Sequence, residues 1–267
     1  SWMPAIWLSR TWPGPAGRGP KRTPAGDNCS TRPSSDALPE FAAAAAAFLA
    51  ERYQALQAQL PPATRLLAVS KGHPASAVRE LAGLGQCSFG ESRLQEATAK
   101  QAELADLPAL DWHFIGRLQA NKVRSVLQRF TWVHSVDSLA LAERVARIAG
   151  EEGVSPKVLL QVKLRPDPAK GGFAPEDLRL AWPQLRALPG VQLMGLMTMA
   201  PLGLDPAQRR SLFGDCADLA RELGLEQLSM GMSGDWQEAA AAGSTWVRIG
   251  SALFGPKPLS SSAWDAI

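Results

Sequence analysis

The stretch Leu66-Leu67-Ala68-Val69-Ser70-Lys71, followed by Gly72-His73-Pro74, decides the fold. An apolar run this short, closed by turn residues, predicts a buried parallel strand. Lys71 then lies at the carboxyl end of the strand, which is the end where α/β folds bind ligands. Apolar walls there would strip water from the ammonium, and a neutral amine attacks aldehydes and ketones. Lys71 therefore indicates Schiff-base chemistry, with a solvent-directed strand-end lysine as the alternative.

Strands and helices alternate along the rest of the chain. An Ala-rich helical pattern over 41–60 precedes the first strand and ends at Pro61-Pro62. Further helices are expected over 76–84, 91–104, 119–128, 139–151, 175–188, 206–223 and 235–242, with a last short one from Ser251. Further strands are expected over 88–90, 113–116, 132–136, 157–162, 193–199, 227–230 and 246–249. Eight β-α units predict a single α/β domain, a closed (β/α)8 (TIM) barrel with a leading helix; an open doubly wound sheet is the alternative.

Composition and charge exclude several classes of protein. The chain has 267 residues, 46% of them hydrophobic and 20% charged, as in soluble globular proteins. The net charge of +3 comes largely from the first segment, so a nucleic-acid-binding body is not expected. No apolar run reaches the roughly 18 residues that span a membrane. The 3 cysteines have neither metal nor disulfide spacing, which favours a reducing compartment, the cytoplasm.

The two ends of the chain differ from its middle. Residues 1–36 are rich in Pro, Gly, Ser and Arg and have no helical or strand periodicity. They predict a disordered extension, or a start assigned too early, because this composition cannot build a core. The barrel domain is expected over 37–257 and a flexible tail over 258–267.

Small and polar residues follow the last two predicted strands. Ser233-Gly234 and Gly250-Ser251 supply hydroxyls and let a ligand approach the backbone closely. Phosphate sites of (β/α)8 barrels are commonly made at these two positions. A lysine opposite such a cradle suits pyridoxal phosphate, or a phosphorylated sugar in a Schiff-base aldolase.

Other candidate residues also have a purely structural interpretation, and for Met232 this is ordinary core packing. In a pyridoxal site Arg248 would contact the ring nitrogen and keep it unprotonated, which weakens the electron sink; otherwise it pairs with a carboxylate at the core edge. His113 is more often a satisfied barrel histidine than a catalytic one. Ser233 is alternatively the N-cap of the helix that starts at Asp235.

Motifs in a fixed order over about residues 37–257 carry a family resemblance. They are LLAVSK (66–71), FGE (89–91), QE (95–96), WHFIG (112–116), LQ (118–119), NK (121–122), GLMTM (195–199), LSMGMS (228–233), Asp235 with Glu238, VRIG (247–250) and FG (254–255). Each is weak alone, but the ordered set is highly specific. The set resembles the pyridoxal phosphate homeostasis protein family, the single-domain relatives of the alanine racemase N-terminal barrel.

This resemblance implies a cofactor and a set of residues that bind it. It implies that Lys71 holds pyridoxal 5′-phosphate as a Schiff base, that Arg248 lies by the pyridine nitrogen, and that the loops after the last two strands hold the phosphate. Ser92-Arg93 replaces the family's Asn-Tyr, so the Ser92 hydroxyl is expected to replace an asparagine contact. The expected cofactor-binding residues are Lys71, Ser92, His113, Met232, Ser233, Arg248, Gly250 and Ser251.

The resemblance leaves two classes of function. A carrier would buffer pyridoxal phosphate or deliver it to apo-enzymes, as a monomer or weak dimer and without a catalytic residue. An amino-acid racemase needs an acid or base on each face of the substrate carbanion. Tyr53, the only tyrosine, is in the leading helix, and no second domain follows the barrel, so the carrier is favoured. The Schiff-base aldolase ranks last because it leaves the motif set unexplained.

Overall fold

The structure is a computed structural model that describes residues 37–168 and 170–255, with side chains from residue 46 onward. By internal contacts the chain divides into Ser1–Glu40, of which only the start of helix α1 is described, and Phe41–Ile267, which contains the barrel. The extension predicted over 1–36 and the tail predicted over 258–267 lie outside the described residues. Within the described ranges, no helix is both long and apolar enough to cross a membrane.

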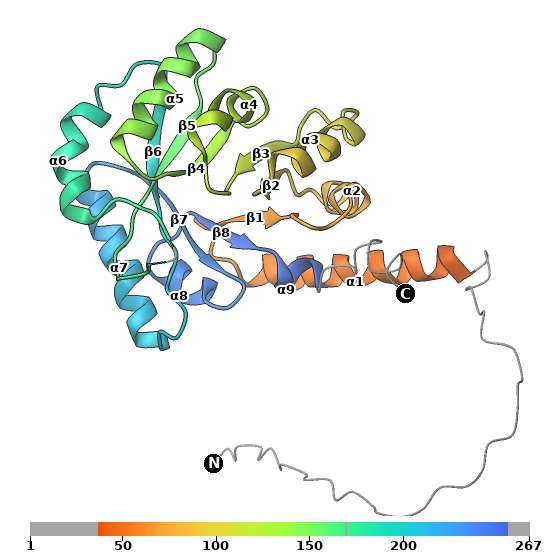
Figure 1. Ribbon diagram of the computed structural model, residues 1–267. Coiled ribbons are helices and arrows are strands. Elements are labelled where there is room, and N and C mark those ends of the chain that lie inside the picture. Colours follow the sequence, from red (N-terminus) through yellow and green to blue (C-terminus); the bar gives the residue numbers. More distant parts are fainter. Residues whose placement is uncertain (1–36, 169, 256–267) are drawn as a thin grey trace, which may run out of the picture. The chain divides into compact units, whose positions relative to one another are not determined.

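Eight parallel strands close into a barrel in the order in which they occur in the chain (Figure 1). The last strand pairs with the first, with Arg65 opposite Trp246 and Ala68 opposite Ile249. The predicted closed barrel is therefore confirmed and the open doubly wound sheet is excluded. The strands are β1 (Arg65–Val69), β2 (Ser88–Glu91), β3 (Asp111–Phe114), β4 (Trp132–Val136), β5 (Lys157–Gln161), β6 (Gln192–Met197), β7 (Gln227–Met232) and β8 (Trp246–Ile249).

Helices follow the strands and pack around the barrel (Figure 1). Local signals set their ends: Asp205 and Gln208 form a reciprocal capping box before α7, and Gly153 ends α5 in the left-handed conformation. The helices are α1 (Ala37–Gln59), α2 (Ala75–Gly83), α3 (Leu94–Glu103), the 3-10 turn η1 (Ala120–Lys122), α4 (Val123–Leu127), α5 (Leu139–Glu152), α6 (Pro175–Leu185), α7 (Pro206–Glu222), α8 (Trp236–Ala241) and α9 (Ser251–Phe254).

Several element boundaries differ from the sequence prediction by one to four residues, among them the following three. Glu91 ends β2 instead of opening a helix, because it pairs with Phe114 of the next strand. The helix predicted over 119–128 is divided into η1 and α4. Strand β7 runs two residues further than predicted, because Met232 pairs with Arg248 of β8. The predicted order of the strands is unchanged by these differences.

Two tryptophans close the amino end of the barrel interior. Trp132 and Trp246 begin β4 and β8, and their rings lie 5.6 Å apart, edge to face. Together with Leu67, Leu159 and Met197 they form a buried cluster that is separate from the larger core containing helix residues. This packing leaves the carboxyl end of the barrel as the end that can receive a ligand, as in other (β/α)8 barrels.

Candidate functional site

The structure brings most of the predicted site residues to one end of the barrel. All eight strands are parallel, so their carboxyl ends meet at the same rim. Residues at this rim lie in or just after β1, β2, β7 and β8: Lys71, Ser92, Met232, Ser233, Arg248, Gly250 and Ser251. His113 is the exception, and its position is described below.

Lys71 follows β1 by two residues, and its side chain is exposed. The expected apolar walls do not enclose it within the described ranges, and its amine is accessible from solvent. An accessible amine can still react with an aldehyde. The backbone on both sides of Lys71 is nevertheless held. The Ser70 N–H donates to the Gly90 carbonyl at 3.1 Å, which continues the sheet, and the Gly72 N–H donates to the Glu96 carboxylate. An accessible amine thus stands on a fixed turn.

A buried ion cluster beside β2 fixes that turn. The Lys100 ammonium donates to the Ser70 carbonyl, to Glu91 Oε1 and to Glu96 Oε1, each at 2.7 Å. The Ser70 hydroxyl also donates to Glu91 Oε1 at 2.7 Å. Lys100 is only 5% exposed and Glu91 is fully buried. The cluster therefore connects both neighbours of Lys71 to strand β2 and helix α3.

Glu91 is the member of this cluster whose buried charge is least completely compensated. Burial raises its pKa, although the bonds from Lys100 and Ser70 act in the opposite direction. Its second oxygen, Oε2, has no hydrogen-bond partner among the described residues. Sequence reasoning missed the cluster because Glu96 and Lys100 are spaced like an ordinary exposed helix pair. Only the packing of α3 against the barrel shows that the pair is buried.

The loops after β7 and β8 are joined to each other. The Ser233 hydroxyl accepts a hydrogen bond from the Ala252 N–H, in the first turn of α9, at 3.2 Å. The alternative that Ser233 caps α8 is wrong: the N-cap is Asp235, whose Oδ1 accepts from the Met232 N–H at 2.6 Å.

This junction leaves donors free for an anion. The backbone N–H groups of Ser233 and Gly234 have no acceptor among the described residues. A Cβ at Gly234 would meet no atom within 4 Å, so the space beside this backbone is open. Hydroxyls and free N–H groups in an open loop are the donor set that binds a phosphate. The residues present therefore fit the predicted phosphate site.

Arg248 is buried within β8 and is 5% exposed. Its guanidinium donates to the Ser229 carbonyl at 2.6 Å, the Ser229 hydroxyl at 2.8 Å and the Thr198 carbonyl at 2.9 Å. These acceptors are neutral, so the alternative of a carboxylate-paired arginine is wrong. Burial lowers the pKa of Arg248 to about 10, and the charge of Asp235 opposes this effect. The guanidinium therefore stays charged at neutral pH.

His113 does not join the residues at the rim. It is fully buried, and its ring stacks on Trp132 at 5.1 Å, because the two residues are opposite each other in the β3–β4 register. Its Nδ1 lies 3.0 Å from Nε2 of His134, and its Nε2 lies 3.3 Å from the carboxylate of Asp111, the first residue of β3. The structure thus shows the barrel-core histidine that was the alternative for this position.

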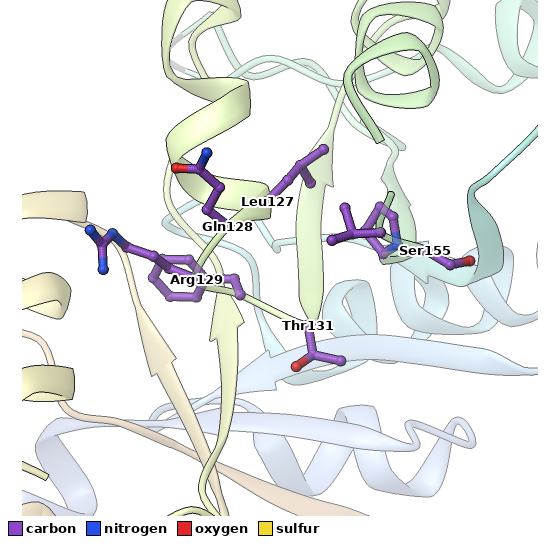
Figure 2. A pocket seen from close by; sticks show the side chains of 8 residues that line it. Leu127, Gln128, Arg129, Thr131 and Ser155 are labelled. Carbon is purple, nitrogen blue, oxygen red and sulfur yellow. The ribbon is translucent and has the colours of Figure 1, made fainter. Parts of the chain in front are cut away.

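A pocket of about 400 Å³ lies at the other end of the barrel (Figure 2). It is lined by segments 127–131 and 154–156, which precede β4 and β5. Figure 2 shows Thr131 and Ser155 from these two segments on its wall. This pocket is therefore distinct from the group of polar residues at the carboxyl ends of the strands.

Known proteins resemble the chain over the whole barrel. The family model "Alanine racemase, N-terminal domain" matches residues 46–258. The pyridoxal phosphate homeostasis protein of Synechocystis sp. is 47% identical over 211 residues, covering 77% of this chain and 97% of that protein. Its namesake in Pseudomonas aeruginosa is 46% identical over 206 residues, covering 76% and 89%.

Solved structures agree with these sequence matches. PipY of Synechococcus elongatus, with PLP bound, is 55% identical, has a TM-score of 0.75, and is matched over 78% of this chain and 100% of its own. An alanine racemase of Clostridium difficile is 20% identical with a TM-score of 0.61, and it shows the shared fold alone. The match covers 80% of this chain but 57% of that racemase.

Proposed function

Because the chain belongs to the pyridoxal phosphate homeostasis protein family, we propose that it binds pyridoxal 5′-phosphate (PLP) and takes part in PLP homeostasis. The observation that carries this proposal is Lys71, an accessible amine on a turn that a buried ion cluster holds in place. Lys71 would hold PLP covalently through its side-chain nitrogen. The aldehyde is the chemistry that the cofactor supplies.

The other rim residues would orient the cofactor. Ser233, Gly250 and Ser251 would hold the phosphate, with Ser92 and Met232 beside the ring. Arg248 would face the ring nitrogen. A guanidinium can only donate hydrogen bonds, so it favours an unprotonated ring nitrogen and makes the ring a weaker electron sink. This electronic effect supports a carrier more than an enzyme of amino-acid chemistry.

The same rim supports a role without turnover. Racemisation needs an acid or base on each face of the reacting carbon. Tyr53, the only tyrosine of the chain, is in α1, and its side chain is buried in the core and not among the rim residues. We therefore favour a carrier that buffers PLP in the cytoplasm and releases it to apo-enzymes, over a racemase. Exposure of Lys71 supports release, because water and amines can reach the bond.

An absorbance spectrum before and after borohydride, followed by peptide mass analysis, tests the proposal. We expect the band of a protein-bound Schiff base to collapse and a pyridoxyl adduct to appear on Lys71. Lys71→Ala should abolish the band and the adduct, whereas Lys122→Ala, an exposed lysine of η1, should keep both. An unchanged band in Lys71→Ala would refute the assignment. Efficient racemisation of an amino acid by the wild-type protein would refute the carrier.

A further inference from the structure

A chain of hydrogen-bonding side chains crosses the barrel interior from the rim to the amino end. Arg248 Nη1 lies 2.8 Å from Ser229 Oγ, and that oxygen lies 2.9 Å from His134 Nδ1. His134 Nε2 lies 3.0 Å from His113 Nδ1. Beyond these three hydrogen bonds, His113 Nε2 lies 3.3 Å from Asp111 Oδ2 without hydrogen-bond geometry, so this last contact is electrostatic only. The chain thus joins four strands, β8, β7, β4 and β3.

The Arg248 end of this series determines the direction of its three hydrogen bonds. Arg248 can only donate, so the Ser229 hydroxyl accepts from it and directs its own hydrogen to His134. His134 then carries its hydrogen on Nε2 and donates to His113. His113 in turn carries its hydrogen on Nε2, facing the Asp111 carboxylate, which can only accept. Donors therefore point from Arg248 towards His113, and the hydrogen left on His113 Nε2 faces the Asp111 carboxylate without a hydrogen bond.

The electrostatics of the interior agree with this direction. Burial lowers the pKa of His113, and it lowers that of His134 well below its ordinary value, with the charges of His113 and Arg248 acting in the same sense on His134. Both imidazoles are therefore neutral at neutral pH. Burial acts to raise the pKa of Asp111, but the interaction with His113 and the hydrogen bonds from Thr131 and Trp132 outweigh it, and the pKa is lowered. A carboxylate and a guanidinium are thus linked by neutral groups.

We propose that Asp111, His113 and His134 are positioning residues for Arg248. With His134 as its acceptor, the Ser229 hydroxyl keeps a lone pair towards the guanidinium; without that acceptor the hydroxyl is free to turn its hydrogen towards Arg248. The chain therefore sets the orientation that Arg248 presents at the rim. This inference rests on the proposed function. It adds that Asp111, at the amino end of the barrel, changes the environment of the ring nitrogen of bound PLP through Arg248, without contacting the cofactor.

The test begins with the cofactor-free protein and nitrogen NMR. In the wild type, we expect His113 and His134 to be neutral with hydrogen on Nε2. Asp111→Asn removes the accepting charge at a partly exposed position, and we expect it to reduce this tautomer in both histidines and to shift the guanidinium resonance of Arg248. Asp106→Asn, which removes an exposed carboxylate that is not part of this series of side chains, should change none of these signals. Wild-type histidines that are charged, or that carry hydrogen on Nδ1, would overturn the proposal.

A double-variant cycle separates the chain from general packing. Ser229→Ala removes the central link, so Asp111→Asn should no longer shift the Arg248 resonance in that background. An equal shift with and without Ser229 would mean that Asp111 acts by another route, and the proposal would fail.

The PLP-loaded protein then gives an independent readout. Asp111→Asn should move the absorbance maximum of bound PLP and raise its Kd about tenfold, with the adduct on Lys71 retained. An unchanged maximum and Kd would contradict the tuning role. Absence of any Lys71 adduct in the wild type would instead refute the proposed function. The NMR experiment on the cofactor-free protein would still test whether Asp111 affects Arg248 through the histidines.

Discussion

Replacing Lys100 by Met tests whether the buried ion cluster holds the Lys71 turn. Methionine keeps most of the length of the lysine side chain and removes its ammonium. The change deletes three hydrogen bonds of 2.7 Å to Ser70, Glu91 and Glu96. It also leaves Glu91, which is fully buried, without a cation.

The expected cost follows from that burial. Removing one partner of a buried ion pair costs about 3–5 kcal/mol, because the other charge stays desolvated. Domains have about 5–15 kcal/mol of stability in total, so Lys100→Met should be severely destabilised. Adding Glu91→Gln removes the orphaned charge and should restore about half of the loss. Loss of the bonds that hold the turn should also slow the reaction of Lys71 with PLP.

The destabilisation depends on pH in a defined direction. Burial already raises the pKa of Glu91, and losing Lys100 raises it further. Folding then favours the protonated carboxyl, a contribution that is fully present below the pKa of the unfolded chain and lost as the pH rises through the folded pKa. The deficit of Lys100→Met relative to the wild type should therefore be largest at neutral pH. It should shrink as the pH falls towards the ordinary pKa of glutamate.

Urea unfolding followed by tryptophan fluorescence measures these differences. Lys122→Met, at an exposed position of η1, is the control and should stay within about 0.5 kcal/mol of the wild type. A loss below about 1 kcal/mol in Lys100→Met, or no recovery on adding Glu91→Gln, would refute the reasoning.

Three further predictions concern other parts of the barrel. Gly116→Ala should lower the free energy of unfolding by about 1–3 kcal/mol in urea titrations, because its Cβ would lie 2.2 Å from a carbonyl oxygen. Gly83→Ala, whose Cβ meets no atom within 4 Å, should not be destabilised. Ser233→Ala should weaken PLP binding about tenfold in a fluorescence titration and keep the Lys71 adduct, since the hydroxyl would hold phosphate and not the aldehyde; an unchanged Kd would contradict this role. A thiol reagent should label exposed Cys87 and spare Cys216 in the folded protein at neutral pH, because burial raises the pKa of Cys216 to about 12; equal labelling would contradict it.

The order of strands could be predicted from the sequence because it depends on local pattern. Strand β8 has the predicted bounds, Trp246–Ile249, since it is a short apolar run between a glycine-containing turn and Gly250. The depth of a side chain in the barrel could not be predicted in this way. His113 points inward, but only its register with Trp132 shows that it lies near the amino end of the barrel interior.

Burial of charged residues was equally hidden in the sequence. Lys100 and Glu96 have the spacing of a solvent-exposed helix pair, and nothing in their neighbourhood shows that α3 turns them towards β2. The environment of Lys71 was predicted wrongly for the same reason. Whether walls surround a strand-end lysine depends on loops that the local pattern does not place.

The pairing of β8 with β1 also has a consequence for synthesis on the ribosome. The barrel cannot close until β8, which ends at Ile249, has left the exit tunnel. Its partner, β1, was made about 180 residues earlier. The same late strand carries Arg248. A nascent chain that stalls before this point therefore lacks both the closing strand and the arginine of the rim. Folding competence and a complete set of rim residues are acquired in the same step of translation.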